Sequence, residues 1–238
     1  MFEVKLEARW FDAVRARQSI RRYAAPPTEE QLRRLGTMAR QLSWQGVRII
    51  LLKGPGLKSA IKGTDVYAPI IASKDAPKEL EGYAGEALAL ECASMGLGTC
   101  WLGGGFHKSV VKIAAKLKEN EHVTCVLAIG QCEAAAPRPK RKSLTSTCGL
   151  GDAQRLELPA WQRAALECAA LAPSAINRQP WRFVVAPGAV QVLDGGGNFG
   201  YGPLDRGIAM LHVAVGAMSA GAQGIWRQVD RGWEFKAK

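Results

Sequence analysis

The order of apolar and polar residues along the chain predicts the same succession of elements twice. Residues 28–52 (TEEQLRRLGTMARQLSWQGVRIILL) have the pattern of a helix, a turn and a strand, and residues 159–185 (PAWQRAALECAALAPSAINRQPWRFVV) repeat that order. Short apolar runs bounded by polar residues predict further strands at 67–73, 123–130 and 189–195. Helices and strands are therefore expected in two similar series, one in each half of the sequence.

An Ala- and Gly-rich segment also occurs twice, at an offset of 125 residues. Residues 85–101 (GEALALECASMGLGTCW) and 210–226 (MLHVAVGAMSAGAQGIW) align Ala89 with Ala214, Ser94 with Ser219, Gly96 with Gly221 and Trp101 with Trp226. Each segment predicts a buried helix that ends at a glycine and is followed by a Trp-bearing turn, and its small residues allow close helix packing. Chance similarity is the alternative, but the matching order of the flanking elements favours an internal duplication.

The two series are separated by a stretch that mixes Pro, Gly, Ser, Thr and charged residues. This stretch, residues 134–154 (AAAPRPKRKSLTSTCGLGDAQ), is predicted to be a linker. A chain of 238 residues has room for one large domain or two small ones. The sequence is therefore divided into a first half, residues 1–142, and a second half, residues 143–238.

The composition is that of an ordinary globular protein, with 47% hydrophobic and 22% charged residues. No segment approaches the roughly 18 uninterrupted apolar residues that a membrane helix requires, so a cytoplasmic protein without membrane contact is expected. The six cysteines form no C-x-x-C pair and no metal-ligand spacing with the three histidines. We expect free, mostly buried thiols and no metal site.

Positive charge is concentrated in the first half of the chain. Residues 1–142 hold 23 basic and 14 acidic residues, a net charge of +9, whereas residues 143–238 carry only +2. Residues 108–118 (KSVVKIAAKLK) have the spacing of a basic amphipathic helix, whose lysines we interpret as a solvated face. The Arg-rich clusters at 15–22 and 138–142 are candidates for phosphate binding, because a guanidinium group matches phosphate oxygens.

A first candidate binding motif, RQSIRRY, spans residues 17–23. If it follows a helix at about residues 5–15 and is extended, Arg17, Ser19 and Arg21 share one side, because side chains alternate along an extended backbone. Two guanidinium groups and a hydroxyl group on one side can hold a phosphate dianion. An exposed Arg-rich helix end is an equally good interpretation of this stretch alone, since cations are favoured at helix C-termini.

A second candidate motif, GLGTCWLGGGF, spans residues 96–106. It follows a predicted helix rather than a strand, and its glycines do not fit G-x-G-x-x-G, so it is no Rossmann fingerprint. The consecutive glycines 103–105 allow the backbone to approach a flat ligand and to present N–H groups without a Cβ in the way. A turn that needs positive φ is the alternative, although one glycine would normally suffice for it.

A third candidate motif, LAPSAINRQPWRFVV, spans residues 171–185. Pro173 stops the preceding helix, Pro180 enforces an extended entry, and the aromatic residues after it pack the next strand into the core. This structural interpretation leaves the polar side chains of Ser174 and Asn177 without a role.

Together, these motifs resemble those of the FMN-dependent nitroreductase family, in which R-x-S-x-R, A-P-S-x-x-N-x-Q-P-W and G-L-G-x-x-W-x-G segments recur. The late LAIG…PRPKRKSL stretch adds to the resemblance. In ordinary members A-P-S-x-x-N-x-Q-P-W follows R-x-S-x-R closely, but here residues 39–52 read ARQLSWQGVRIILL and the motif occurs only in the second half. The chain therefore resembles the TM nitroreductase branch, in which two subunits are fused into one polypeptide as a pseudo-dimer.

The resemblance implies an α+β, nitroreductase-like fold, with antiparallel-rich central sheets flanked by helices and two related halves. In the family, one subunit supplies the phosphate arginines and the glycine backbone of each flavin site, and its partner supplies the P-S-x-x-N loop. The fused chain would then hold one complete FMN site, with the reciprocal site degenerate. A monomeric pseudo-dimer is expected, and further self-association remains open.

Carried over position by position, the resemblance assigns flavin contacts to both halves. Arg17 and Ser19 would bind the FMN phosphate, Gln18 the ribityl or pyrimidine region, and Arg21 the pyrimidine edge. Leu102, Gly103 and Gly104 match the backbone that approaches flavin N5, although members often have an acidic residue in place of Gly103. Arg141, with Lys140 and Lys142 as competitors, matches a late phosphate contact, and Pro173, Ser174, Ala175 and Asn177 match the loop over the isoalloxazine.

The activity that the resemblance implies is a ping-pong oxidoreductase reaction. NADH or NADPH would reduce the flavin, and a small-molecule acceptor, such as a nitroaromatic or a quinone, would then take the electrons. No catalytic acid or nucleophile is expected. The alternatives are a degenerate flavin-binding or non-enzymatic binding module and, third, a basic nucleic-acid-binding protein, which is disfavoured because no helix-turn-helix, zinc spacing or aromatic-basic sheet signature accompanies the charge.

Overall fold

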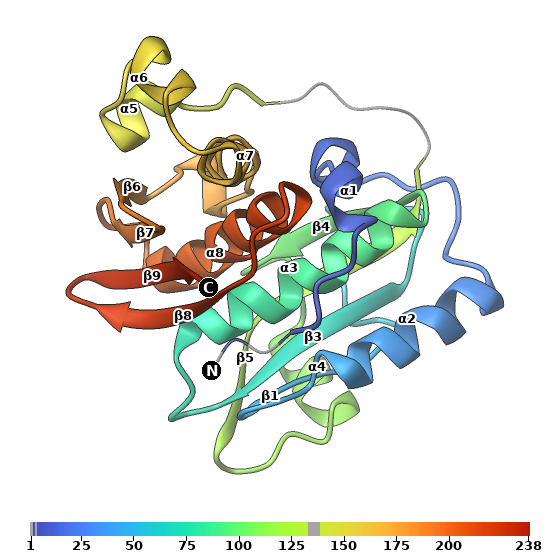
Figure 1. Ribbon diagram of the computed structural model, residues 1–238. Coiled ribbons are helices and arrows are strands. Elements are labelled where there is room, and N and C mark those ends of the chain that lie inside the picture. The colour runs from blue at the N-terminus through green and yellow to red at the C-terminus, as the bar shows by residue number, and fades with distance from the viewer. Residues whose placement is uncertain (1, 3, 133–138) are drawn as a thin grey trace. The chain divides into compact units, whose positions relative to one another are not determined.

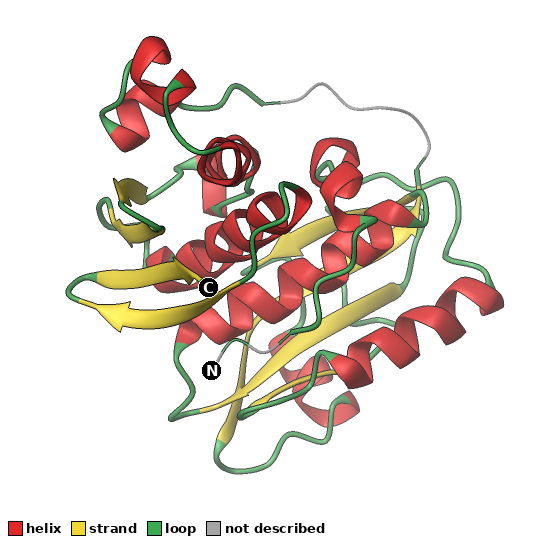
Figure 2. Ribbon diagram, viewed as in Figure 1, coloured by secondary structure: helices red, strands yellow, loops and turns green. Residues whose placement is uncertain are grey.

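A computed structural model describes residues 2, 4–132 and 139–238 (Figures 1 and 2). Its α-helices are α1 (Trp10–Ala16), α2 (Glu29–Gln41), α3 (Lys78–Ser94), α4 (Lys108–Ala114), α5 (Leu144–Cys148), α6 (Asp152–Leu156), α7 (Ala160–Ala170) and α8 (Gly202–Ser219), and a 3₁₀ turn covers Ala175–Asn177. The strands are β1 (Val47–Ile49), β2 (Leu52–Lys53), β3 (Val66–Ser73), β4 (Leu97–Leu102), β5 (Glu121–Gln131), β6 (Trp181–Ala186), β7 (Ala189–Asp194), β8 (Gly224–Val229) and β9 (Gly232–Ala237).

The described residues group into two compact units, and each draws on separate stretches of the sequence. The first unit contains residues of 1–15, 78–83 and 139–238, and the second contains residues of 16–77 and 84–138. Helix α3 therefore begins in the first unit and continues in the second. The two predicted halves, 1–142 and 143–238, were inferred from repeats in the sequence and not from compactness. They stay a prediction.

The second unit is built on a five-stranded antiparallel sheet. Its strand order is β1-β3-β5-β4, with β2 also paired to β3. Helix α2 lies beside β1 (Figure 1). It begins at Thr28, whose side chain accepts a hydrogen bond from the backbone N–H of Gln31 while the Gln31 side chain accepts one from the backbone N–H of Thr28. This capping box satisfies two backbone donors that the first turn would otherwise leave free.

The first unit carries a four-stranded antiparallel sheet in the order β6-β7-β9-β8. Helices α7 and α8 lie side by side in this unit (Figure 2). A Cβ at Gly216 of α8 would lie only 2.3 Å from the carbonyl oxygen of Ala164 in α7, so a glycine is needed there for the two backbones to approach. His212 is fully buried in the same contact, where its Nδ1 lies 2.9 Å from the carbonyl oxygen of Cys168.

The two sheets have the same topology once their elements are matched along the chain. The series β1, β3, α3, β4 and β5 matches β6, β7, α8, β8 and β9, and each sheet has the same strand order in these terms. The offset of 125 residues brings the end of α3 at Ser94 onto the end of α8 at Ser219. The expected buried helices are present, because most residues of both helices are buried.

A reciprocal contact joins the start of α3 to α8 within the first unit. A Cβ at Gly82 would lie 1.9 Å from the carbonyl oxygen of Leu204, and a Cβ at Gly207 would lie 2.0 Å from the carbonyl oxygen of Glu79. The two glycines are 125 positions apart, and so are the two carbonyl residues. Each helix thus presents the same pair of positions to the other, which is the pattern of an isologous contact.

The structure differs from the sequence-based expectations in several places, and one of them is the first helix, α1, which begins at Trp10 rather than near residue 5. Trp101 and Trp226 lie on strands β4 and β8 rather than in turns, because each glycine after the helix redirects the chain straight into a strand. The expected linker contains two short helices, α5 and α6. Each has a local start signal, since the Ser143 side chain accepts from the backbone of Ser146 and the Gln154 side chain accepts from the backbone N–H of Gly151. Residues 134–138 of that linker lie outside the described residues.

In the part of the chain that the structure describes, no helix combines the length and apolar character needed to cross a membrane. The six cysteines are free, and four of them are buried, as expected.

Candidate functional site

The first motif, residues 17–23, is anchored by its apolar residues to strands β4 and β5. Ile20 and Tyr23 are buried in a cluster of the second unit that also contains Leu102 and Ala128. The backbone N–H of Ile20 donates to the carbonyl oxygen of Thr99, and the hydroxyl of Tyr23 donates to that of Ala128. This packing leaves Ser19 and Arg21 exposed and fixes the backbone that carries them.

Arg17 lies in a different environment from the other members of its motif. Its side chain is 5% exposed, and its Nε lies 3.5 Å from Oε1 of Glu86, a fully buried residue of α3. The indole Nε1 of Trp101 donates to Oε2 of the same carboxylate over 2.8 Å. The expected surface of Arg17, Ser19 and Arg21 therefore consists of two exposed residues and one buried ion pair, and the predicted phosphate contact of Arg17 stays a prediction. The partly buried Gln18 lies between them.

Arg17 and Arg21 nevertheless both lie close to strand β4. Burial raises the pKa of the Cys100 thiol, and the guanidinium groups of Arg21 and Arg17 oppose that rise by favouring the thiolate. Cys100 is two residues before Leu102, where β4 ends and the glycine segment begins. The structure thus brings the first two predicted motifs to one part of the second unit.

The glycine segment after β4 has a conformation that does not itself require glycine. Gly103, Gly104 and Gly105 are absent from the positions with positive φ, so the turn interpretation does not explain them. A Cβ at Gly104 would meet no atom within 4 Å, whereas one at Gly105 would contact the Leu102 side chain at 3.1 Å. The open space at Gly104 fits a backbone kept bare for a ligand. Lys58 holds this segment in place, since its Nζ donates to the carbonyl oxygen of Gly104 over 2.9 Å.

The third motif forms a tightly bonded loop in the first unit. Its helix ends with α7, and Ile176, Asn177 and Gln179 all have positive φ, a conformation that is rare for non-glycine residues. The Ser174 hydroxyl oxygen accepts from the backbone N–H of Gln179 over 2.8 Å, and the Gln179 side chain donates to the carbonyl oxygen of Asn177 over 3.0 Å. Ser174 therefore has a structural role that the sequence did not reveal.

The predicted basic contact at residues 140–142 is joined to this loop. Arg141 Nη1 donates to Oδ1 of Asn177 over 2.6 Å, and Nδ2 of Asn177 donates to the carbonyl oxygen of Lys140 over 2.8 Å. The Lys142 backbone N–H donates to Oε1 of Gln179, and its Nζ donates to the carbonyl oxygen of Gln179. These bonds give Asn177 an intramolecular role and place Lys140 and Arg141 in the first unit, beside the loop, rather than in the unit that holds the first motif.

A buried acid ties the third motif to the loop before α8. Oδ1 of Asp205 accepts from the backbone N–H of Ala175 over 2.9 Å, and its Oδ2 accepts from Nδ2 of Asn198 over 2.5 Å. The same Asn198 nitrogen donates to the carbonyl oxygen of Ala175 over 3.1 Å. We call Asp205, Asn198 and Ala175 the loop clamp. Burial raises the pKa of Asp205 to about 6, although the bonds from Ala175 and Asn198 favour the ionised form.

The raised pKa of Asp205 predicts a pH-dependent stability. The folded state binds the proton more tightly than the unfolded chain, whose Asp pKa is near 3.8. The contribution of Asp205 to the free energy of unfolding should therefore fall as the pH rises from about 4 to about 6 and then stay constant, a total loss of about 2 to 3 kcal/mol. Urea unfolding of the wild type and of Asp205→Asn at several pH values would measure this contribution as the difference between the two curves.

The comparison of Asp205→Asn with the wild type is internally controlled, since every other ionisable group is shared between the two proteins. The difference in unfolding free energy should change between pH 4 and pH 6 and be flat above pH 7. Parallel curves across the whole range would show that the carboxyl group of Asp205 titrates normally.

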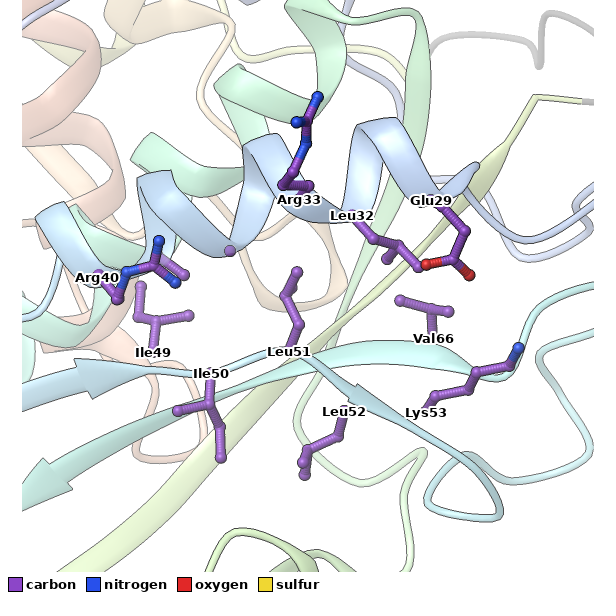
Figure 3. Close-up of a pocket in the computed structure, with 12 residues that line it drawn as sticks. Glu29, Leu32, Arg33, Arg40, Ile49, Ile50, Leu51, Leu52, Lys53 and Val66 are labelled. Carbon is purple, nitrogen blue, oxygen red and sulfur yellow. The ribbon is translucent and has the colours of Figure 1, made fainter.

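A groove of about 560 Å³ lies elsewhere in the second unit, between α2 and the β1–β2 stretch (Figure 3). Leu51 points toward α2, whereas Ile50 and Leu52 point away from it. The groove follows the break between β1 and β2. None of the predicted site residues lines it, and its Arg33 is paired with Glu30. We therefore place the candidate site at the motifs and not at this groove.

The structure leaves the predicted residues in two sets, one in each unit. Arg17, Gln18, Ser19, Arg21, Leu102, Gly103 and Gly104 belong to the second unit, and Lys140, Arg141, Pro173, Ser174, Ala175 and Asn177 belong to the first. Sequence reasoning missed Glu86, Asn198 and Asp205. The signal for Glu86 was a carboxylate within residues 85–101, a segment predicted to be a buried helix, where a carboxylate needs a specific partner. Among residues 2, 4–132 and 139–238, no group of His, Cys, Asp and Glu could hold a metal ion.

Comparison with known proteins gives one family and one fold. The family model described as "Putative TM nitroreductase" matches residues 10–217. The solved structure of the "putative nitroreductase (tm1586)" from Thermotoga maritima MSB8 is similar with a TM-score of 0.72 and 19% identity, over 95% of this chain and 93% of that chain. None of the curated proteins matches. The likeness in structure confirms the α+β fold that the sequence motifs predicted.

Two further structures resemble only part of the chain. The "Putative NADH dehydrogenase/NAD(P)H nitroreductase" from Parabacteroides distasonis ATCC 8503 has a TM-score of 0.48 and 17% identity, over 58% of this chain and 96% of that chain. The "FMN-dependent Nitroreductase (CDR20291_0767)" from Clostridium difficile R20291 has a TM-score of 0.45 and 18% identity, over 54% of this chain and 90% of that chain.

Proposed function

Because the chain belongs to the nitroreductase family whose model matches residues 10–217, we propose that it is an FMN-dependent oxidoreductase. Family membership supports an oxidoreductase, and the cofactor, the substrates and the mechanism are our proposal. We propose that NADH or NADPH donates electrons and that a nitroaromatic, a quinone or another small molecule accepts them in a ping-pong reaction. The observation that carries the cofactor is the glycine segment, since Gly104 has open space just after β4 and the exposed Ser19 is bridged to Thr99 of that strand.

We propose that the first motif holds the anionic and polar parts of FMN. Ser19 and Arg21 are exposed on a backbone that Ile20 and Tyr23 fix, so their polar groups are available to a phosphate or to the pyrimidine edge. A guanidinium group beside the pyrimidine favours negative charge there, in the manner of an oxyanion hole. Arg17 would contribute to the phosphate contact from its buried position, where Glu86 orients it.

We propose that the glycine segment supplies the backbone contact to the flavin ring and that the Pro173–Asn177 loop supplies the second. A bound FMN would supply two-electron redox chemistry between a nicotinamide and the acceptor. The protein then has to bind, orient and shield, and it needs no acid, base or nucleophile of its own. Gly103 and Gly104 suit this role because their N–H groups carry no side chain that would keep a flat ring away.

The test of this proposal is flavin binding by the purified chain. The protein should be yellow as purified, or it should bind added FMN and quench its fluorescence. The expected stoichiometry is one FMN per chain. Arg21→Ala should weaken FMN binding by about 10-fold to 100-fold, since a charge-assisted hydrogen bond is worth about 1.5–3 kcal/mol. Anaerobic addition of NADH and of NADPH, in separate experiments, should bleach the bound flavin and so identify the donor.

The matched control is Arg34→Ala, which removes an exposed arginine from α2 in the same unit. It changes the net charge equally and should leave FMN binding as it is. A colourless protein that refuses added FMN would contradict the proposal, and it would leave the non-enzymatic binding module as the better interpretation. Equal weakening by both variants would assign the effect to net charge alone.

We also propose that the chain is an internal duplication that forms a pseudo-dimer by itself. The identical order of strands in the two sheets and the reciprocal contact of Gly82 and Gly207 support this proposal. We propose a small-molecule acceptor as its partner, with no role for nucleic acid, and a cytoplasmic location. Light scattering at increasing concentration would measure whether one chain is the stable form.

A further inference from the structure

The groove between α2 and the β1–β2 stretch is formed by one compact unit alone. All of its lining residues belong to the second unit, and none of them is a predicted flavin contact. Its volume of about 560 Å³ lies within the range of about 300–1,000 Å³ that is usual for small-molecule sites. The groove is therefore large enough to hold a ligand of its own.

Two apolar walls enclose this groove. On α2, Leu32, Gly36 and Ala39 follow one another at helical spacing and share one face of the helix. On the opposite wall, Ile49 and Leu51 point toward α2 (Figure 3). Space remains between the walls because a glycine and an alanine occupy helix positions that larger apolar side chains would fill.

Gly36 is a residue that the packing of α2 does not require. A Cβ at this position would meet no atom closer than Nη1 of Arg40 at 3.8 Å, an ordinary van der Waals distance. Gly36 is also absent from the glycines with positive φ. A glycine within a helix destabilises it relative to alanine, so this one has a cost without a local structural reason. It does keep the helix backbone open to a molecule in the groove.

A cation lies at one end of the groove. Arg40 is exposed, and its Nη2 donates to the hydroxyl oxygen of Thr37 over 3.0 Å. Within the described part of the chain, no carboxylate forms an ion pair with Arg40. A guanidinium group has five N–H donors, so several of them stay available to an anionic ligand.

The other end of the groove has no comparable excess of positive charge. Glu29 and Lys53 both line that end (Figure 3), and their charges offset each other. Arg33 is paired with Glu30 and extends away from the strands. Glu29 and Arg40 are separated by about 16 Å along the helix axis. An anionic group is therefore favoured at the Arg40 end and disfavoured beside Glu29.

We propose that this groove binds an elongated apolar carboxylate, such as a free fatty acid, with its carboxylate group at Arg40. A guanidinium group matches a carboxylate with two parallel hydrogen bonds. The apolar chain would lie over Gly36 and Leu51 and extend toward Leu32, where burial of its methylene groups favours binding. This site is separate from the predicted flavin contacts and does not rest on the proposed function.

The test is binding of decanoate, below its micellar concentration, to the full chain. Isothermal titration calorimetry should show one site per chain, and decanoate should raise the melting temperature because it binds the folded state. Arg40→Gln should weaken binding by about fivefold to tenfold, between the effects of an exposed and a buried charged contact. Gly36→Leu should weaken it by about tenfold or more, because the new side chain fills the groove. Its melting temperature should not fall, since leucine is the better helix former.

The matched controls are Arg34→Gln and Gln41→Leu, which make the same kinds of change at exposed positions of α2 outside the groove. Both should bind decanoate as the wild type does. Decan-1-ol, which has the same chain without the charge, should bind more weakly, and Arg40→Gln should not change its affinity. If Gly36→Leu does not fold, the comparison of Arg40→Gln with Arg34→Gln decides.

Three results would overturn the inference. The first is a wild type that binds no decanoate, and the second is binding that neither Arg40→Gln nor Gly36→Leu weakens. The third is loss of a concentration-dependent dimer in Gly36→Leu without decanoate binding by the wild type, which would make the groove a contact between two copies of the chain. None of these measurements involves FMN, so the proposed function stands or fails separately.

Discussion

Alanine at Gly207 is expected to destabilise the protein by about 3 kcal/mol or more. The added Cβ would lie 2.0 Å from the carbonyl oxygen of Glu79, and backbone atoms of Glu79 surround it, so no flexible side chain can move aside. Inserting even one carbon into a packed contact typically costs about 1–3 kcal/mol, and a collision with backbone lies at or beyond the upper end of that range. Urea unfolding of the wild type and of Gly207→Ala would measure the difference.

Gly82→Ala should have an effect of the same size, because its Cβ would meet the carbonyl oxygen of Leu204 at 1.9 Å. The matched control is Gly36→Ala in α2. There the new Cβ would meet only the far end of the Arg40 side chain at 3.8 Å, so this variant should be more stable by about 0.5–1 kcal/mol, the usual gain from replacing glycine within a helix. Gly207→Ala and Gly82→Ala proteins as stable as the wild type would contradict the close helix contact.

Removal of the Arg17 guanidinium group is expected to cost about 3 kcal/mol of stability in the protein without cofactor. Arg17→Met keeps much of the side-chain volume but leaves the fully buried carboxylate of Glu86 without its cation. Breaking a buried ion pair from one side typically costs about 3–5 kcal/mol, because the remaining charge stays desolvated. Thermal and urea unfolding of the apoprotein at neutral pH would measure the loss.

The double variant with Glu86→Gln separates this structural role from a role in ligand binding. The amide side chain removes the buried charge and can still accept the hydrogen bond from Trp101, so the double variant should recover most of the stability that Arg17→Met loses. FMN binding should not recover with it, since the proposed phosphate contact needs the guanidinium group itself. An apoprotein of Arg17→Met that is as stable as the wild type would refute the ion pair.

The fold was predictable wherever a single period or a single start signal dominates the sequence. Residues 67–73 and 123–130 were expected to be strands and form most of β3 and β5, and residues 189–195 cover β7. The short helices α5 and α6 were missed because five-residue helices carry little periodicity, and their starts depend on Ser143 and on the backbone of Gly151. The Trp residues after the Gly-rich helices were placed in turns because a glycine marks the end of a helix but does not specify the next element.

The candidate site was predictable as a set of motifs and not as a set of contacts. Ser19 and Arg21 were expected to be accessible to a ligand, and both are exposed. The burial of Arg17 was not predicted, because nothing in RQSIRRY indicates its ion pair with the distant Glu86. The sequence revealed no structural role for Ser174 and Asn177, since their partners depend on a loop with left-handed residues that only the fold specifies. Long-range polar pairs of this kind are set by tertiary structure, which local patterns do not encode.

The reciprocal glycines also bear on how such a protein can change over evolutionary time. In an assembly of two identical chains, one mutation alters both ends of a symmetric contact at once, so each change is tested twice. Here the two ends, Gly82 and Gly207, are encoded separately, and either half can vary while the other is kept. If the chain is the duplication that we propose, one half could lose a binding loop, as we propose for residues 39–52, while the other copy at 171–185 is kept.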